Sequence, residues 1–213
     1  MLPTETPSPQ IARARRVPQQ QRSRDTLRRV LEAADALLTR DGAAALSMSR
    51  LAAEAGVAVG SIYAYLPDKE SIVEALALGY WTAFAERVAA VALADEAAPV
   101  PDPTDAVFDT LADCFRERPG FRALWYGGLR TEQVRDTTRG VRVTVAASVE
   151  RVLATHRPGA APADRAAAAQ TLVLVGDGLL REAFRRDPAG DPAVLAEGRL
   201  VLRAYLQARL PAA

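Results

Sequence analysis

The sequence has very few of the residues that metal and disulfide sites need. Its 213 residues include one cysteine, Cys114, and one histidine, His156. A single cysteine cannot form an intramolecular disulfide, and a single histidine cannot supply a multi-histidine metal cluster. We therefore predict no metal site and no cofactor, and we expect His156, which is close to a helix end, to lie at the surface.

Common catalytic motifs are also missing. The chain has no Gly-x-Ser-x-Gly elbow and no glycine-rich loop that would hold a phosphate. The run Gly176-Asp177-Gly178 lacks the third glycine and the preceding strand of a dinucleotide fingerprint. These absences favour a protein that is not an enzyme.

The sequence contains no apolar run of 18 residues and no start typical of a signal sequence, so we expect a cytoplasmic protein without a membrane partner. Aromatic residues make up only 6% of the chain, while long windows rich in Ala, Leu, Arg and Glu favour helix. With 49% hydrophobic and 25% charged residues, the composition is that of a globular chain. We predict an all-α fold with about nine helices.

Positive charge is concentrated near the start of the chain, although the net charge is only +1. Residues 13–29 contain one acidic residue, Asp25, and seven basic residues: Arg13, Arg15, Arg16, Arg22, Arg24, Arg28 and Arg29. Residues 1–21 include four prolines and no apolar periodicity, so we expect a disordered arm there. A basic arm beside a DNA-binding motif indicates phosphate binding, whereas alone it would equally fit a solubilising tail.

The stretch 47–69 has the pattern of two short helices that cross at a tight turn. Ala52 and Gly56 are four residues apart, as a helix-turn-helix needs: a small side chain at the helix contact, then a residue that adopts positive φ. Small or hydroxylated residues follow at positions where a recognition helix would enter a major groove. The alternative is a helix corner inside an ordinary bundle.

Capping signals place further helices around this motif. One helix is expected from Ser23 to the Asp41-Gly42 stop, Ser47 is the expected N-cap of the next, and Asp68 can cap a long helix. We therefore divide the chain into a basic arm (1–21), a three-helix domain that contains the helix-turn-helix (22–68) and a helical C-terminal domain (69–213), for which ligand binding and dimerisation are implied only by a family resemblance. Lys69, the only lysine, lies in the first turn of the long helix, where a positive charge is unfavourable with respect to the helix dipole. A contact with a DNA phosphate would explain a lysine at this position.

Residues 22–80 resemble the N-terminal DNA-binding domain of the tetracycline-repressor (TetR) family of bacterial regulators. The similarity is densest in the contiguous run from Gly56 to Glu70, GVAVGSIYAYLPDKE. Ala58, Val59 and Ala64 depart from the family pattern toward apolar residues, so hydrogen-bonded base readout should be sparse. By position, the resemblance implies phosphate contacts from Ser47, Tyr63, Tyr65 and Lys69, and base-edge contacts from Ser49, Val59, Gly60 and Ser61.

Aromatic residues in the C-terminal part are candidates for an apolar ligand cavity between helices. The candidates are Trp81, Phe84, Phe108, Cys114, Phe115, Trp125 and Tyr126. For any single one of them, plain core packing is the favoured explanation. Asp177, within the apolar run LVLVGDGLL, is costly to bury alone, so it faces the cavity, pairs with Arg181 one turn on, or contacts another subunit.

Two apolar helices are expected at the C-terminal end, over about 170–184 and from Val194 onward, separated by the break 187–192. They complete one core or form a four-helix bundle between two subunits. The family resemblance favours the bundle, and we expect Leu202 to lie in the interface.

Together these features predict a homodimeric repressor that a small apolar molecule releases from a palindromic double-stranded DNA operator. The competing classes are a helical small-molecule binder or enzyme without specific DNA binding, and a sequence-tolerant DNA-binding protein without an inducer.

Overall fold

The computed structural model describes the backbone of residues 9–128 and 131–211, and the side chains of residues 23–128, 131–136 and 138–211. Every regular element in these ranges is helical, which confirms the predicted all-α fold. The described chain forms nine α-helices and one short 3-10 helix: α1 (Pro9–Asp41), η1 (Ala43–Ala45), α2 (Met48–Ala55), α3 (Val59–Tyr63), α4 (Lys69–Ala97), α5 (Pro103–Glu117), α6 (Pro119–Tyr126), α7 (Glu132–His156), α8 (Pro162–Arg186) and α9 (Pro192–Arg209).

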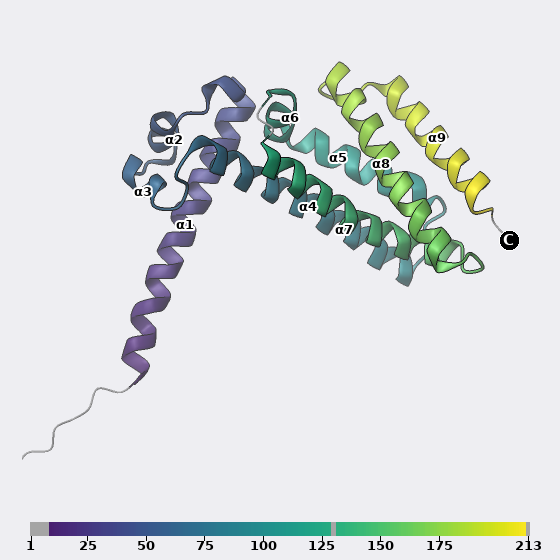
Figure 1. The fold of residues 1–213 in the computed structure, drawn as a ribbon, viewed down its shortest axis with the longest axis horizontal. Helices are drawn as coiled ribbons and strands as arrows, with labels where there is room; N and C mark the ends of the chain where they lie inside the picture. Colours follow the sequence, from purple (N-terminus) through teal and green to yellow (C-terminus); the bar gives the residue numbers. More distant parts are fainter. Residues whose placement is uncertain (1–8, 129–130, 212–213) are drawn as a thin grey trace, which may run out of the picture.

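The helices form two parts that share α4 (Figure 1). Helices α1 to α3 and the start of α4 make up one end of the molecule, which we call the head. In the other part, α5, α6 and α7 pack on α4, while α8 packs on α5 and α7, and α9 packs on α5 and α8. Helix α4 packs on α1 at one end and along α7 over much of its length. The predicted boundary between residues 68 and 69 coincides with the start of α4 and stays a prediction, because this helix contributes to both parts.

The first helix begins earlier than the sequence predicted. Its first residue is Pro9 rather than Ser23, so residues 9–21, which the sequence assigned to a disordered arm, belong to α1 in the structure. Residues 1–8 of that arm lie outside the described chain. The expectation of disorder rests on the lack of apolar periodicity. Such periodicity indicates that one face of a helix is buried, but an exposed helix can form without it, and the Ala, Arg and Gln residues of this stretch have good intrinsic helix propensity.

Side-chain caps determine where several helices begin. The Asp68 carboxylate accepts from the Ser71 backbone N–H at 2.8 Å, and the Ser71 hydroxyl lies 3.3 Å from the Asp68 N–H, a reciprocal capping box. Asp102 and Asp191 cap α5 and α9 just before a proline at the first helical position. The predicted caps at Ser47 and Asp68 are confirmed, while α8 begins at Pro162, earlier than expected.

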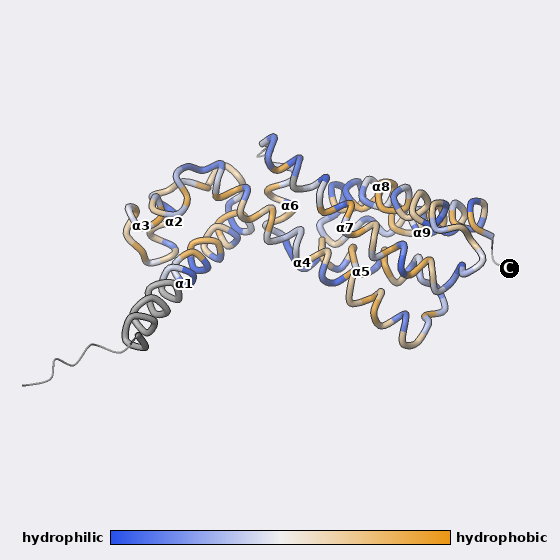
Figure 2. The backbone as a smooth tube through the Cα atoms, turned by 60° about the horizontal axis from the view of Figure 1, so that its bottom comes forward, coloured by the Kyte–Doolittle hydropathy of each residue, from blue (hydrophilic) through white to orange (hydrophobic). Residues whose placement is uncertain are grey.

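One continuous apolar core runs through both parts. Along the tube in Figure 2, apolar and polar stretches alternate within the helices, as amphipathic helices require. Phe121 of α6 lies at the centre of an aromatic cluster. Its ring centroid is 4.9 to 5.7 Å from those of Tyr80, Trp81, Phe84, Phe115 and Trp125.

His156 was expected at the surface, but the structure places it in a largely buried position. Its side chain is 15% exposed, and its Nε2 lies 2.8 Å from a carboxylate oxygen of Asp95, which is fully buried. The same oxygen accepts from the Val100 backbone N–H at 2.9 Å. The histidine therefore joins the end of α7 to the end of α4, because a buried carboxylate needs hydrogen-bond donors.

Helix α4 is long and apolar enough to cross a membrane by length and composition alone, and 44% of its most apolar window is buried inside the protein. Its position at the centre of the core explains that composition.

Candidate nucleic-acid interface and ligand cavities

The turn between α2 and α3 has the geometry that the sequence predicted. Gly56 ends α2 in the left-handed region, at φ 63° and ψ 42°. The Val57 N–H then donates to the Ala52 carbonyl at 3.0 Å, and Ala52 is buried between the helices. A glycine is needed here because other residues adopt this backbone conformation at a cost.

An arginine from α1 fixes this turn. Nη2 of Arg29 donates to the carbonyl of Ala55 at 2.5 Å and to that of Gly56 at 3.2 Å. These carbonyls have no partner within α2, and a guanidinium suits the negative end of the helix dipole. Arg29, one of the seven basic residues counted near the start of the chain, therefore has partners within the protein. Arg28 pairs with Glu32 at 2.9 Å. The side chains of Arg13 to Arg22 lie outside the described residues, so the phosphate-binding role of the arm stays a prediction.

Helix α3 has one buried side chain and an exposed face. Ile62 is buried and holds the helix against the head, while Val59, Gly60, Ser61 and Tyr63 are exposed. The side chain of Tyr63 is about half accessible, at 51%. The four predicted contact residues of this helix therefore lie together on an open surface.

The other predicted DNA contacts lie around α3, and most also make contacts within the protein. The Ser47 hydroxyl accepts from the Arg50 N–H at 3.4 Å and lies 3.4 Å from the Ser49 hydroxyl. The Tyr65 hydroxyl donates to Ser23 Oγ at 2.9 Å, and Lys69 Nζ donates to the Ala43 carbonyl at 3.3 Å. An ammonium has three protons, so Lys69 keeps donors for a second partner.

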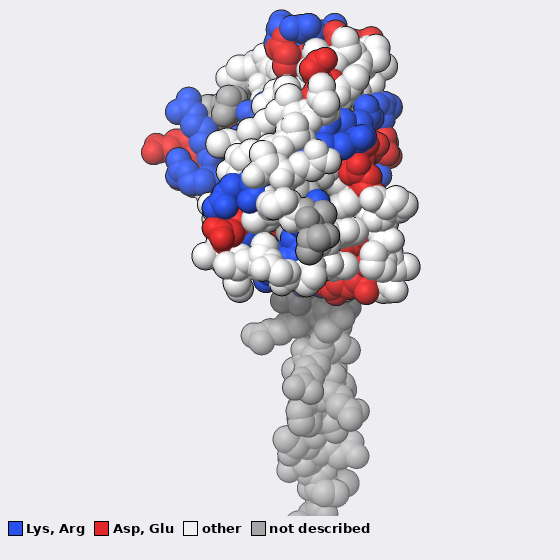
Figure 3. All heavy atoms as spheres, turned by 90° about the vertical axis from the view of Figure 1, so that its right-hand side faces the viewer, with Lys and Arg blue, Asp and Glu red and all other residues white. Residues whose placement is uncertain are grey.

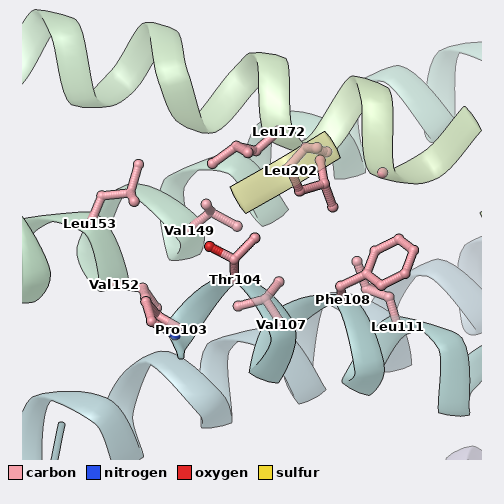
Figure 4. A pocket seen from close by; sticks show the side chains of 12 residues that line it. Pro103, Thr104, Val107, Phe108, Leu111, Val149, Val152, Leu153, Leu172 and Leu202 are labelled. Carbon is pink, nitrogen blue, oxygen red and sulfur yellow. The ribbon is translucent and has the colours of Figure 1, made fainter. Parts of the chain in front are cut away.

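Two apolar cavities lie in the C-terminal part. The larger, about 40 Å³, which we call the α5 cavity, is enclosed by α5, α7, α8 and α9 (Figure 4). It is lined by Pro103, Thr104, Val107, Phe108, Leu111, Val149, Val152, Leu153, Leu172, Val173, Gly176 and Leu202. The smaller, about 20 Å³, which we call the Asp177 cavity, is lined by Trp81, Phe84, Leu111, Phe115, Val141, Arg142, Val145, Val173, Asp177 and Leu180.

The predicted ligand-binding residues separate into three groups. Trp81, Phe84, Phe115 and Asp177 line the Asp177 cavity, and Phe108 lines the α5 cavity. Trp125 and Tyr126 line neither of these two cavities. The Trp125 ring packs against the Arg181 guanidinium, 3.8 Å from the ring centroid, and the Tyr126 hydroxyl donates to the Arg181 carbonyl at 2.6 Å.

Asp177 is held by two arginines. Its carboxylate accepts from Arg181 Nε at 2.8 Å, which was one of the three alternatives, and also from Nη2 of Arg142. It therefore pairs and lines the cavity at once. Sequence reasoning missed Arg142 because it lies 35 positions upstream on α7. It also missed the aliphatic lining, since aliphatic periodicity does not distinguish a cavity wall from a packed core.

The head is joined to the C-terminal part at α6. Burial, and then a hydrogen bond to Asp35 of α1, raises the pKa of Tyr80 on α4, so its hydroxyl stays protonated and donates. Gly120 of α6 packs against this pair so closely that an added methyl group would overlap both polar atoms. A methyl group at Gly127 would similarly overlap the side chain of Ala43. Three helices therefore meet at one close contact.

Comparison with known proteins places both parts in one family. Residues 30–76 match the family model "Bacterial regulatory proteins, tetR family", and residues 98–210 match "Tetracyclin repressor-like, C-terminal domain". No curated protein sequence matches the chain.

Solved structures with the same fold cover nearly the whole chain. A TetR-family transcriptional regulator from Streptomyces coelicolor is 29% identical with a TM-score of 0.61, over 87% of this chain and 99% of that one. The multidrug binding protein EbrR, complexed with imidazole, is 25% identical with a TM-score of 0.60, over 84% and 93%. The SmeT–triclosan complex, 21% identical with a TM-score of 0.62 over 86% and 90%, shares the fold.

The contact between Arg29 and the turn predicts a difference between two adjacent arginines. Arg29→Ala removes the donor to two carbonyls at the end of α2, and we expect it to lower the free energy of unfolding by about 1–3 kcal/mol. Arg28→Ala removes the same charge from an exposed pair and should cost less than about 0.5 kcal/mol. Urea unfolding of both variants measures the two changes in the free energy of unfolding. Equal decreases would contradict the capping role of Arg29.

Proposed function

The chain belongs to the TetR family of transcriptional regulators, and from that premise we propose that it is a homodimeric repressor that a small molecule releases from a palindromic operator. The observation that carries this proposal is the exposed face of α3. This helix follows a left-handed glycine turn in the head, and the head contacts, at α6, a part that contains apolar cavities.

Helix α3 would lie in the major groove, with the base edges contacted by its first residues and by α2. Ser49, Val59, Gly60 and Ser61 are assigned to base edges, and all four are exposed. Val59 offers only an apolar surface, which suits a thymine methyl group. Specificity then depends largely on apolar contact, DNA shape and the spacing of two half-sites.

Phosphate contacts would come from the residues that surround α3. Ser47, Tyr63, Tyr65 and Lys69 are assigned to the DNA backbone, since hydroxyl and ammonium groups donate to phosphate oxygens. Tyr65 and Lys69 already donate within the protein, to Ser23 and to the Ala43 carbonyl. These bonds orient both side chains before DNA arrives, which lowers the entropy lost on binding.

Dimerisation would use the outer faces of α8 and α9, but not the residue that the sequence suggested. Leu202 is 4% exposed and lines the α5 cavity, so its predicted place in the interface is wrong. Leu174 of α8 and Leu200 of α9 are 59% and 60% exposed, and Val201 is 43% exposed. Figure 3, which faces the end of the molecule near the C terminus, shows charged atoms mostly at the margins with uncharged atoms between them.

These exposed side chains continue as stripes of small residues. On α9, Ala196, Leu200 and Ala204 follow one another at four-residue spacing, and on α8 an exposed Gly178 lies one turn after Leu174. Two such faces related by a two-fold axis would form a four-helix bundle.

The ligand would act by selecting a conformation. Pockets that hold drug-sized ligands have volumes of roughly 300–1,000 Å³. The two cavities, of about 40 and 20 Å³, are far smaller. The closed arrangement therefore binds such a molecule poorly, and a more open arrangement binds it better. The ratio of the two affinities sets how far the population moves away from the DNA-binding arrangement. The similarity to EbrR, a multidrug binding protein solved as a complex with imidazole, supports a small-molecule ligand for this chain.

The phosphate role of Lys69 is tested by the salt dependence of DNA binding. Lys69→Ala should weaken binding to all DNA sequences and lower the slope of log K against log salt by about one for each half-site, because one phosphate contact is lost. Fluorescence anisotropy over a salt series measures both quantities. Lys69→Arg should keep the slope, and Arg139→Ala on α7 is the control for loss of a distant charge.

An unchanged slope for Lys69→Ala would refute the phosphate contact. If the unmodified protein bound DNA no better than a protein of similar charge, it would instead belong to the competing class of helical small-molecule binders without specific DNA binding.

The dimer interface is tested by placing a charge on its exposed face. Leu200→Asp should produce monomers in sedimentation velocity and weaken binding to a palindrome at least about a hundredfold, since burying a lone charge in an apolar interface costs several kcal/mol. Leu93→Asp on α4, where the leucine is 57% exposed, is the matched control and should stay dimeric. A monomeric unmodified protein would overturn the proposed assembly.

A further inference from the structure

Two buried N–H groups at the Asp177 cavity have no acceptor among the described residues. They are Nε1 of Trp81 on α4 and Nε of Arg142 on α7, and both residues line this cavity. Buried donors are nearly always paired in folded proteins, because an unpaired one loses its hydrogen bonds to water without replacement. Two unpaired donors at one small cavity therefore indicate a place for an acceptor.

The charge around these donors is positive. Arg142 and Arg181 both bind the Asp177 carboxylate, so the group of three has a formal charge of +1. The other residues that line the Asp177 cavity are uncharged. An anionic acceptor is therefore favoured over a neutral one, and a cation is disfavoured, since charges interact more strongly where water is scarce.

The two cavities are neighbours with shared walls. Leu111 of α5 and Val173 of α8 line both of them. Beyond these two residues the α5 cavity is lined by aliphatic and aromatic side chains, with Thr104 the one polar side chain in its lining (Figure 4). A molecule that passes between Leu111 and Val173 would therefore meet charge at one end and an apolar surface along the rest.

We propose that this regulator senses an amphipathic carboxylic acid. The carboxylate accepts from Trp81 and Arg142 in the Asp177 cavity, and an apolar chain extends between Leu111 and Val173 into the α5 cavity. The assignment deepens the proposed function by naming the ligand class of its sensing part. Leu111 and Val173 must separate to admit the chain, and Trp81 is adjacent in sequence to Tyr80, which holds the head through Asp35.

The ligand class is tested by calorimetry on the full-length protein without DNA. The probes are saturated monocarboxylic acids of six to fourteen carbons, with primary amines of matched length. We expect one acid per chain, an affinity at least about tenfold higher for acids than for amines, and a gain of about fourfold for each added methylene until the α5 cavity is filled.

Two variants separate the contacts of the carboxylate from those of the chain. Trp81→Phe replaces the indole by a smaller aromatic ring and removes one donor, so acids should bind about threefold to tenfold more weakly. At Gly176 an added Cβ meets Leu202 and Phe108 at 3.6 and 3.7 Å, ordinary contact distances, so Gly176→Ala should fold. Its methyl group reduces the α5 cavity and should lower the gain with chain length while short acids still bind.

Arg142→Gln should weaken acid binding further than Trp81→Phe, and Arg139→Gln is its matched control. Arg139 lies on the same helix with its side chain 77% exposed, so its loss should leave acid binding unchanged. Equal affinity for acids and amines, unmodified affinity in Arg142→Gln, or no binding of any acid would each overturn the proposal. If the protein binds a palindrome but no acid, only the ligand class fails; if it binds acids but no DNA, the regulatory function fails.

Discussion

The hydrogen bond from Tyr80 to Asp35, packed against Gly120, is the contact on which the rest of the structure depends. It joins α1 of the head to α4 and α6 of the C-terminal part, and the absence of a side chain at Gly120 lets the three helices meet. The pKa of Tyr80 is raised by burial, so the hydroxyl remains a donor across the physiological range. Movement of α6 or α4 should therefore move the head, because Gly120 packs directly against the two hydrogen-bonded oxygens.

The aromatic cluster extends this contact toward the cavities. Phe121 of α6 lies between Tyr80 and the rings of Trp81, Phe84 and Phe115, and those last three line the Asp177 cavity. Close-packed side chains move together rather than compress. A ligand that needs a larger cavity than about 20 Å³ must therefore displace residues that also position the head. The factor by which such a ligand weakens DNA binding is set by the ratio of its affinities for the displaced and the undisplaced arrangement.

Local signals in the sequence predicted the fold and the turn. Gly56 predicted a left-handed helix end, Ser47 and Asp68 predicted helix starts, and helix-forming composition predicted the all-α class, all of which the structure confirms. Contacts between distant residues were not predictable in this way. Arg142 lies 35 positions from Asp177, and His156 lies 61 positions from Asp95. Periodicity identified an apolar stripe on α9, but it did not show that Leu202 faces the cavity and Leu200 faces outward.

The most direct test is the DNA affinity of Gly120→Ala, measured on the operator palindrome, once genomic footprinting has identified it, and on one isolated half-site. The added methyl group must separate the helices at the Tyr80–Asp35 contact without touching α3. The account predicts at least about a tenfold loss on the palindrome and no loss on the half-site, because spacing changes while each head is intact. Gly79→Ala, where an added methyl group meets open space, is the control. Unchanged palindrome affinity, or equal loss on both DNAs, would contradict it.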